Sequence, residues 1–112
     1  DFLSNAYEDK LILNKHLEDI NAINKYAEQN SLQTIAIIFP FMNDFELSKK
    51  LYVDRISSYF LEKKINFINV TNMKFDSNIS KIVNNNDAHP SAYVHKKVSE
   101  VLSKKINTIF IN

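Results

Sequence analysis

The residue types best suited to chemistry lie in the stretch Asp87-Ala88-His89-Pro90. Histidine is the side chain whose ordinary pKa suits proton transfer at neutral pH. A carboxylate two residues away can accept the second ring N–H, which sets the tautomer and stabilises the imidazolium. Asp87 and His89 are therefore the candidate acid–base pair of an active site, with His89 as general base and Asp87 orienting it.

The same stretch can also be explained without catalysis. Pro90 suits the first position of a helix, and Asp87 or His89 can cap the free N–H groups there. A D-x-H-P match found by chance most often has such a structural role. The alternative function is then a small, non-catalytic α/β interaction domain in which this stretch is only a helix cap.

The elements that must position these residues alternate along the chain. Hydrophobic periodicity predicts helices at Tyr7–Gln29, at Glu46–Lys63 and after Pro90, and strands at Thr34–Phe39, Ile65–Val70 and Thr108–Ile111. The run "LQTIAIIFP" is polar on neither face, which is typical of a strand buried between two layers of helices. Asn43 or Asp44 is the expected N-cap of the second helix.

Each pair of strands is separated by enough residues to hold a crossover helix, which indicates parallel βαβ units. The predicted fold class is therefore α/β, a three-layer α/β/α arrangement around a parallel sheet. Ligands of such sheets bind at the carboxyl ends of the strands. The long connection between the second strand and the D-x-H-P stretch is of a length that is often functional.

Composition excludes several classes of function. The chain contains no Gly, where average usage predicts about eight, so it has no Walker loop, dinucleotide fingerprint or G-x-S-x-G elbow. A net charge of +1 argues against nucleic-acid binding driven by bulk charge. No apolar run approaches the roughly 20 residues that span a bilayer. The 112 residues form one domain, and its thin sheet suggests the C-terminal part of a larger one.

The block "DAHPSAYVHKKVSEVL" resembles the last conserved block of the SGNH (GDSL-type) hydrolases. The strand "TIAIIFP" and the later strand "INFINV" agree with the pattern of that family, and the resemblance covers about Leu11 to Leu102. It implies a partial flavodoxin-like fold and an esterase or O-acyltransferase that works by serine acylation. The implied substrate is a small-molecule or carbohydrate ester, with no metal or organic cofactor.

The chain departs from the family pattern at several positions. The commoner D-x-x-H spacing would put the acid at Asn86, whereas the D-x-H spacing resembles a subset that includes alginate O-acetyltransferase-like proteins. Ser91 replaces the usual Asn, and Val94 the usual Gly. The blocks with the nucleophilic serine and the oxyanion donors have no counterpart. We expect them in an N-terminal part of the same protein, and we expect the 112 residues alone to be inactive.

The other candidate residues are weaker. His95 lies on the predicted last helix and is expected to be a surface or packing residue, while His16 lies among polar neighbours and is expected to be solvated. A metal site could be assembled from Asp76, Asp87 and His89, but nothing in their spacing favours it. His89 is therefore the histidine expected to be functional.

Overall fold

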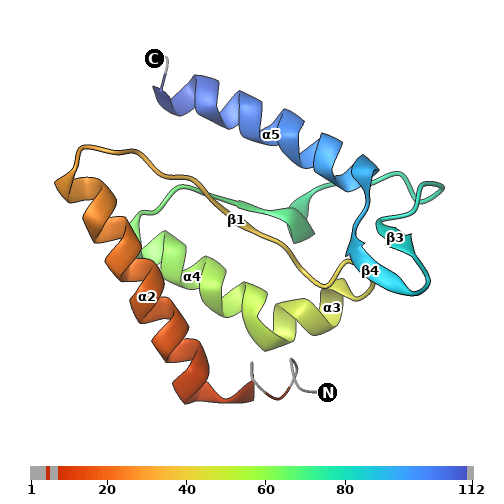
Figure 1. Cartoon of the computed structure of the whole chain (residues 1–112), viewed down its shortest axis with the longest axis horizontal. Helices are drawn as coiled ribbons and strands as arrows, with labels where there is room; N and C mark the ends of the chain where they lie inside the picture. The colour runs from red at the N-terminus through yellow and green to blue at the C-terminus, as the bar shows by residue number, and fades with distance from the viewer. Residues whose placement is uncertain (1–4, 6–7, 111–112) are drawn as a thin grey trace.

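The computed structural model describes residue 5 and residues 8–110. The structure contains both helices and strands, and two of the strands form a small parallel sheet (Figure 1). The elements are α2 (Lys10–Gln29), β1 (Ala36–Ile38), α3 (Phe45–Ser48), η1 (Lys49–Val53), α4 (Asp54–Lys63), β2 (Phe67–Asn69), η2 (Val70–Asn72), β3 (Ile82–Asn84), β4 (Asp87–Pro90) and α5 (Ala92–Phe110).

Strands β1 and β2 pair in parallel, as the sequence predicts. Ala36 lies opposite Phe67 and Ile38 opposite Asn69. The helical segment from α3 to α4 connects the two strands, so the expected strand–helix–strand unit is present. A parallel pair needs such a crossover because its strands start at the same edge of the sheet.

Hydrophobic side chains cover both faces of this strand pair. Ile38 is 6% exposed and belongs to a cluster with residues of α2 and α4, among them Leu17 and Phe60. Its neighbour Ile37 packs against a second cluster that contains Val94 of α5. Because successive side chains of a strand point to opposite faces, β1 contributes to both cores. Figure 1 shows α5 on one side of the strands and α4 on the other.

The predicted helix Glu46–Lys63 is confirmed, with one irregularity. Asp44 is its N-cap, and its Oδ1 accepts the N–H of Leu47 at 2.9 Å. The middle of the helix, η1, is a π-helical turn in which the N–H of Asp54 donates to the carbonyl of Lys49. Such wide turns are rare, and they occur mostly as single turns within α-helices.

Two helices of this glycine-free chain end at left-handed residues. Ser31 follows α2 with φ 56°, and Lys64 follows α4 with φ 57°. At both ends the backbone N–H of the following residue donates to a carbonyl of the last helical turn. The N–H of Leu32 donates to the carbonyl of Ala27, and the N–H of Ile65 donates to the carbonyl of Phe60. This is the Schellman motif, in which Gly normally occupies the left-handed position. The absence of Gly therefore leaves two strained helix ends.

The predicted strand Thr108–Ile111 is wrong for the residues that can be assessed. Helix α5 continues through Thr108 to Phe110, and Ile111 lies outside the described residues. No Gly or Pro lies between Leu102 and Thr108, so nothing in the chain stops the helix there. Among the described residues, no third strand joins β1 and β2.

Candidate acid–base site

The D-x-H-P stretch forms a strand, not the start of a helix. β3 and β4 make an antiparallel hairpin in which Asn84 lies opposite Asp87 and Ile82 opposite Pro90. In a strand, residues two apart point to the same face. The hairpin therefore places the side chains of Asp87 and His89 side by side.

The two side chains are in direct contact. His89 Nδ1 lies 2.5 Å from Asp87 Oδ1, and the same oxygen accepts the backbone N–H of His89 at 3.0 Å. These bonds, the backbone one first, hold the pKa of Asp87 below its usual value of 3.8. An ionised Asp87 makes Nδ1 the protonated nitrogen of a neutral ring, so Nε2 carries the lone pair. Nε2 is thus the atom that can accept a proton.

The pair is open to solvent. The side chain of His89 is 85% exposed and that of Asp87 is 43% exposed. Within residues 8–110, Nε2 has no hydrogen-bond partner, and no serine hydroxyl is bonded to the ring. The arrangement supplies a base and its orienting carboxylate, and a nucleophile for it has to come from elsewhere.

The helix-cap explanation of this stretch is wrong in its detail. Helix α5 begins at Ala92, and the Oγ of Ser91 accepts the N–H of Val94 at 3.4 Å, as an N-cap does. Pro90 is the last residue of β4. Asp87 and His89 are therefore not needed to start the helix.

Ser91 also fixes the hairpin to the preceding loop. Its Oγ donates to the carbonyl of Ser80 at 2.8 Å, and its N–H donates to the carbonyl of Lys81 at 3.0 Å. Ile82 of β3 packs against the second hydrophobic cluster, which contains Val94 and Val98. The base of the hairpin is thus anchored while its strand β4 remains accessible.

A cavity of about 380 Å³ lies at the carboxyl ends of β1 and β2. Its lining residues come from the segments that follow these strands, including the start of α3 and η2, and from the loop before β3: Met42, Asn43, Phe45, Thr71, Met73, Phe75 and Lys81. The rings of Phe45 and Phe75 pack edge to face at 6.3 Å, and Lys81 Nζ lies 5.8 Å from the Phe45 centroid. This is the edge at which α/β sheets bind ligands. Neither Asp87 nor His89 lines the cavity.

Three phenylalanines, Phe41, Phe45 and Phe75, lie near the carboxyl ends of β1 and β2 in the sequence. Phe45 and Phe75 do line the cavity, whereas Phe41 packs edge to face on Tyr52 at 5.5 Å, in the first core. Lys81 was missed, because a single lysine in a polar loop carries no signal in the sequence.

The remaining histidines behave as surface residues. His95 is exposed and its ring lies 5.9 Å from that of Phe39, which agrees with the expected packing role. His16 is exposed on α2, as predicted. Asp76 is not brought to Asp87 and His89, since no metal-binding group of three or more His, Cys, Asp or Glu side chains forms in the described part of the chain.

Comparison with known proteins does not assign this site to a family. No family model matches the chain, and no curated protein or solved structure matches it significantly. None of the helices described has the length and hydropathy to cross a bilayer.

Proposed function

We propose that Asp87 and His89 are the acid–base pair of an SGNH-type serine hydrolase or O-acyltransferase, of which this chain is the C-terminal part. The observation that carries the proposal is the contact between His89 Nδ1 and Asp87 Oδ1, because it leaves Nε2 as the basic nitrogen. The strand–helix–strand unit from β1 to β2 and the helix α5 after the D-x-H-P stretch also support it, whereas the β3–β4 hairpin is not part of the expected family pattern. The parallel pair β1–β2 would be two strands of a larger, three-layer flavodoxin-like sheet.

In this mechanism His89 Nε2 takes the proton of a serine hydroxyl as that hydroxyl attacks the carbonyl of an ester. The imidazolium then returns the proton to the departing alcohol, and the acyl group remains on the serine. Asp87 stabilises the imidazolium through Nδ1. In the second half of the reaction, Nε2 activates in the same way the group that takes the acyl group from the serine. That group is water in a hydrolase and a sugar hydroxyl in a transferase. The substrate would be a small-molecule or carbohydrate ester, and no metal or organic cofactor is required.

The nucleophile and the oxyanion hole would come from an N-terminal part of the same protein. That part would lie beside the carboxyl ends of β1 and β2, on the side of the molecule where the hairpin lies in Figure 1. The 112-residue chain alone should not turn over esters, since loss of the oxyanion hole by itself lowers rates by a factor of about 100 to 1,000.

One observation favours the second candidate, a non-catalytic interaction domain. His89 is 85% exposed, and Asp87 Oδ1 also accepts the backbone N–H of His89, which is a common local turn. In this interpretation the pair would only stabilise β4. Turnover by the whole protein separates the two candidates.

The test uses the whole protein that contains this chain and a small chromogenic acyl ester. His89→Ala should lower kcat by about 1,000-fold or more, and Asp87→Asn should lower it by a smaller factor, because Asp87 acts only through His89. His95→Ala is the matched control and should be close to the parent. Parent-like turnover by His89→Ala, or no labelling of the protein by a serine-directed fluorophosphonate, would overturn the proposal.

A further inference from the structure

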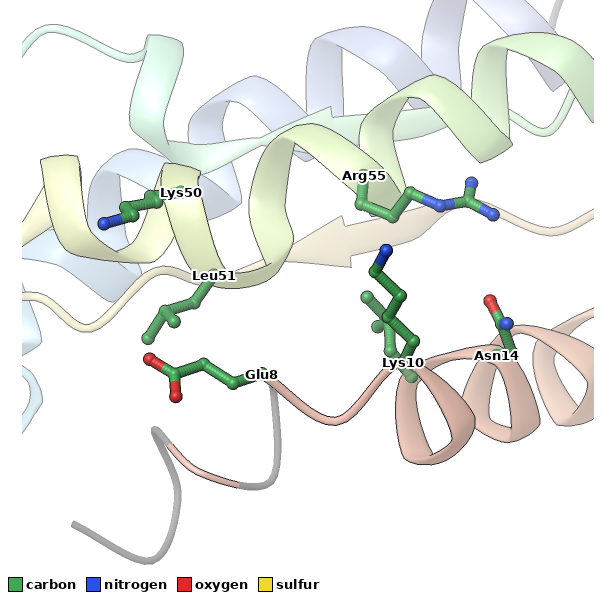
Figure 2. A pocket seen from close by; sticks show the side chains of 7 residues that line it. Glu8, Lys10, Asn14, Lys50, Leu51 and Arg55 are labelled. Carbon is green, nitrogen blue, oxygen red and sulfur yellow. The ribbon is translucent and has the colours of Figure 1, made fainter.

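A second cavity lies far from the hairpin, between the start of α2 and the irregular helix. Its volume is about 510 Å³, which is within the range of small-molecule sites. Seven side chains line it: Glu8, Lys10, Leu13, Asn14, Lys50, Leu51 and Arg55. Figure 2 shows Lys50, Leu51 and Arg55 on the helical wall, facing Glu8, Lys10 and Asn14 on the other. We name this cavity the α2–η1 groove.

The π-turn shapes the helical wall of the groove. In a regular α-helix, residues five apart point about 140° away from each other, because each residue turns the chain by about 100°. The wide turn closed by the bond from Asp54 N–H to the Lys49 carbonyl brings such residues closer to one side. Lys50 and Arg55 are five apart and both line the groove, and in Figure 2 their side chains extend toward opposite ends of it. Single π-turns are frequently found at functional sites.

The groove carries an excess of positive charge. Lys10, Lys50 and Arg55 line it together with one carboxylate, Glu8, which leaves two positive charges. In Figure 2 the ammonium end of Lys10 extends toward the Arg55 side chain. None of the three cations has an ion-pair partner in the described part of the chain, whereas Lys15 and Lys49 do. An anion bound by both Lys10 and Arg55 would offset their charges.

The type of cation also matters. Arg55 is the only Arg in the chain, whose other thirteen basic residues are Lys. A guanidinium can donate two parallel hydrogen bonds to a phosphate or a carboxylate, which an ammonium cannot. The amide of Asn14 adds a neutral donor beside it.

From this geometry we infer that the α2–η1 groove binds the phosphate group of a small molecule at its Arg55 end, held by Lys10 and Arg55 with the Asn14 amide beside them. The ammonium of Lys50 lies at the opposite end of the groove, on the same side as Glu8 (Figure 2). A phosphate monoester carries about −1.5 to −2 charges at pH 7, which matches the excess of two positive charges in the groove. A monocarboxylate would leave one cation uncompensated. The site does not use Asp87 or His89 and does not depend on the proposed hydrolase function.

The test is a titration of the 112-residue chain, followed by ¹⁵N NMR at constant ionic strength. Phenyl phosphate and inorganic phosphate are the probes, and benzoate is the carboxylate control. Saturable shifts should be confined to the amides of residues 8–14 and 49–55. Tighter binding of phenyl phosphate would identify an organic phosphate as the ligand, and equal binding would identify the phosphate group alone. Benzoate binding as tight as phenyl phosphate would overturn the assignment.

Charge variants separate a site from general attraction. Arg55→Gln and Lys10→Gln should each raise the dissociation constant by about tenfold, as expected for one lost charge-assisted contact. Lys96→Gln removes the same charge from the exposed face of α5 and should leave binding unchanged. Equal weakening by all three variants, or no saturable shift with either phosphate probe, would overturn the inference.

Discussion

The strand–helix–strand unit from β1 to β2 and the hairpin β3–β4 are held together in different ways. The first is built on buried side chains, such as Val53, which is not exposed at all, and Phe60, which is 3% exposed. In the hairpin, Val83 is 53% exposed, and its anchors are hydrogen bonds such as that from Ser91 Oγ to the Ser80 carbonyl. The stability of the fold therefore resides in the first region, and the second can carry reactive side chains without being needed for folding.

The largest expected change in the free energy of unfolding tests whether the strand–helix–strand unit, and not the hairpin, stabilises the fold. Phe60→Ala removes a buried aromatic ring and should lower the free energy of unfolding by about 3–5 kcal/mol. Val83→Ala in β3 is the matched hairpin variant and should change it by about 0.5 kcal/mol or less. Urea denaturation followed by circular dichroism measures both. Similar losses in the two variants would show that the hairpin is part of the cooperative core.

A smaller effect, of opposite sign, is expected at the strained end of α4. Lys64→Gly should raise the free energy of unfolding by roughly 1 kcal/mol, because Gly adopts the left-handed conformation without a steric penalty. Lys63→Gly is the matched control one residue earlier. It lies within the helix and should lower stability by about 1 kcal/mol. If both variants were destabilised equally, the left-handed residue would not be a source of strain.

The smallest expected effect is a change in the pKa of Asp87 in the hairpin. The pKa of Asp87 is lowered, so its hydrogen bonds are fully formed above its usual value of 3.8 and are lost as the pH falls through the lower, folded-state pKa. A carboxyl ¹³C NMR titration measures this pKa. His89→Ala keeps the backbone N–H, the largest cause of the shift, and should therefore leave the pKa lowered, though less than in the parent. A return to the usual value in His89→Ala would show that the side-chain contact dominates.

The hydrophobic pattern predicted the central unit because its signals are local. The run around Ile37 and Ile38 is apolar on both faces, and the structure covers both faces. Asp44 was one of two candidate caps, and its carboxylate does cap the helix. The last strand was mispredicted because β-branched residues near Thr108 suit a strand as well as a helix, and only the continuation of α5 decided between them.

The sequence by itself determined which residue types are available. It contains one D-x-H-P stretch, one Arg and no Gly, and these facts exclude glycine-dependent chemistry and name Asp87 and His89 as candidates. Only the tertiary structure decided that this stretch is a strand, since pairing with β3 involves backbone groups that carry no side-chain signal. The same holds for the α2–η1 groove. Lys10 and Arg55 are 45 positions apart in the chain, and only the packing of α2 against the irregular helix brings them together.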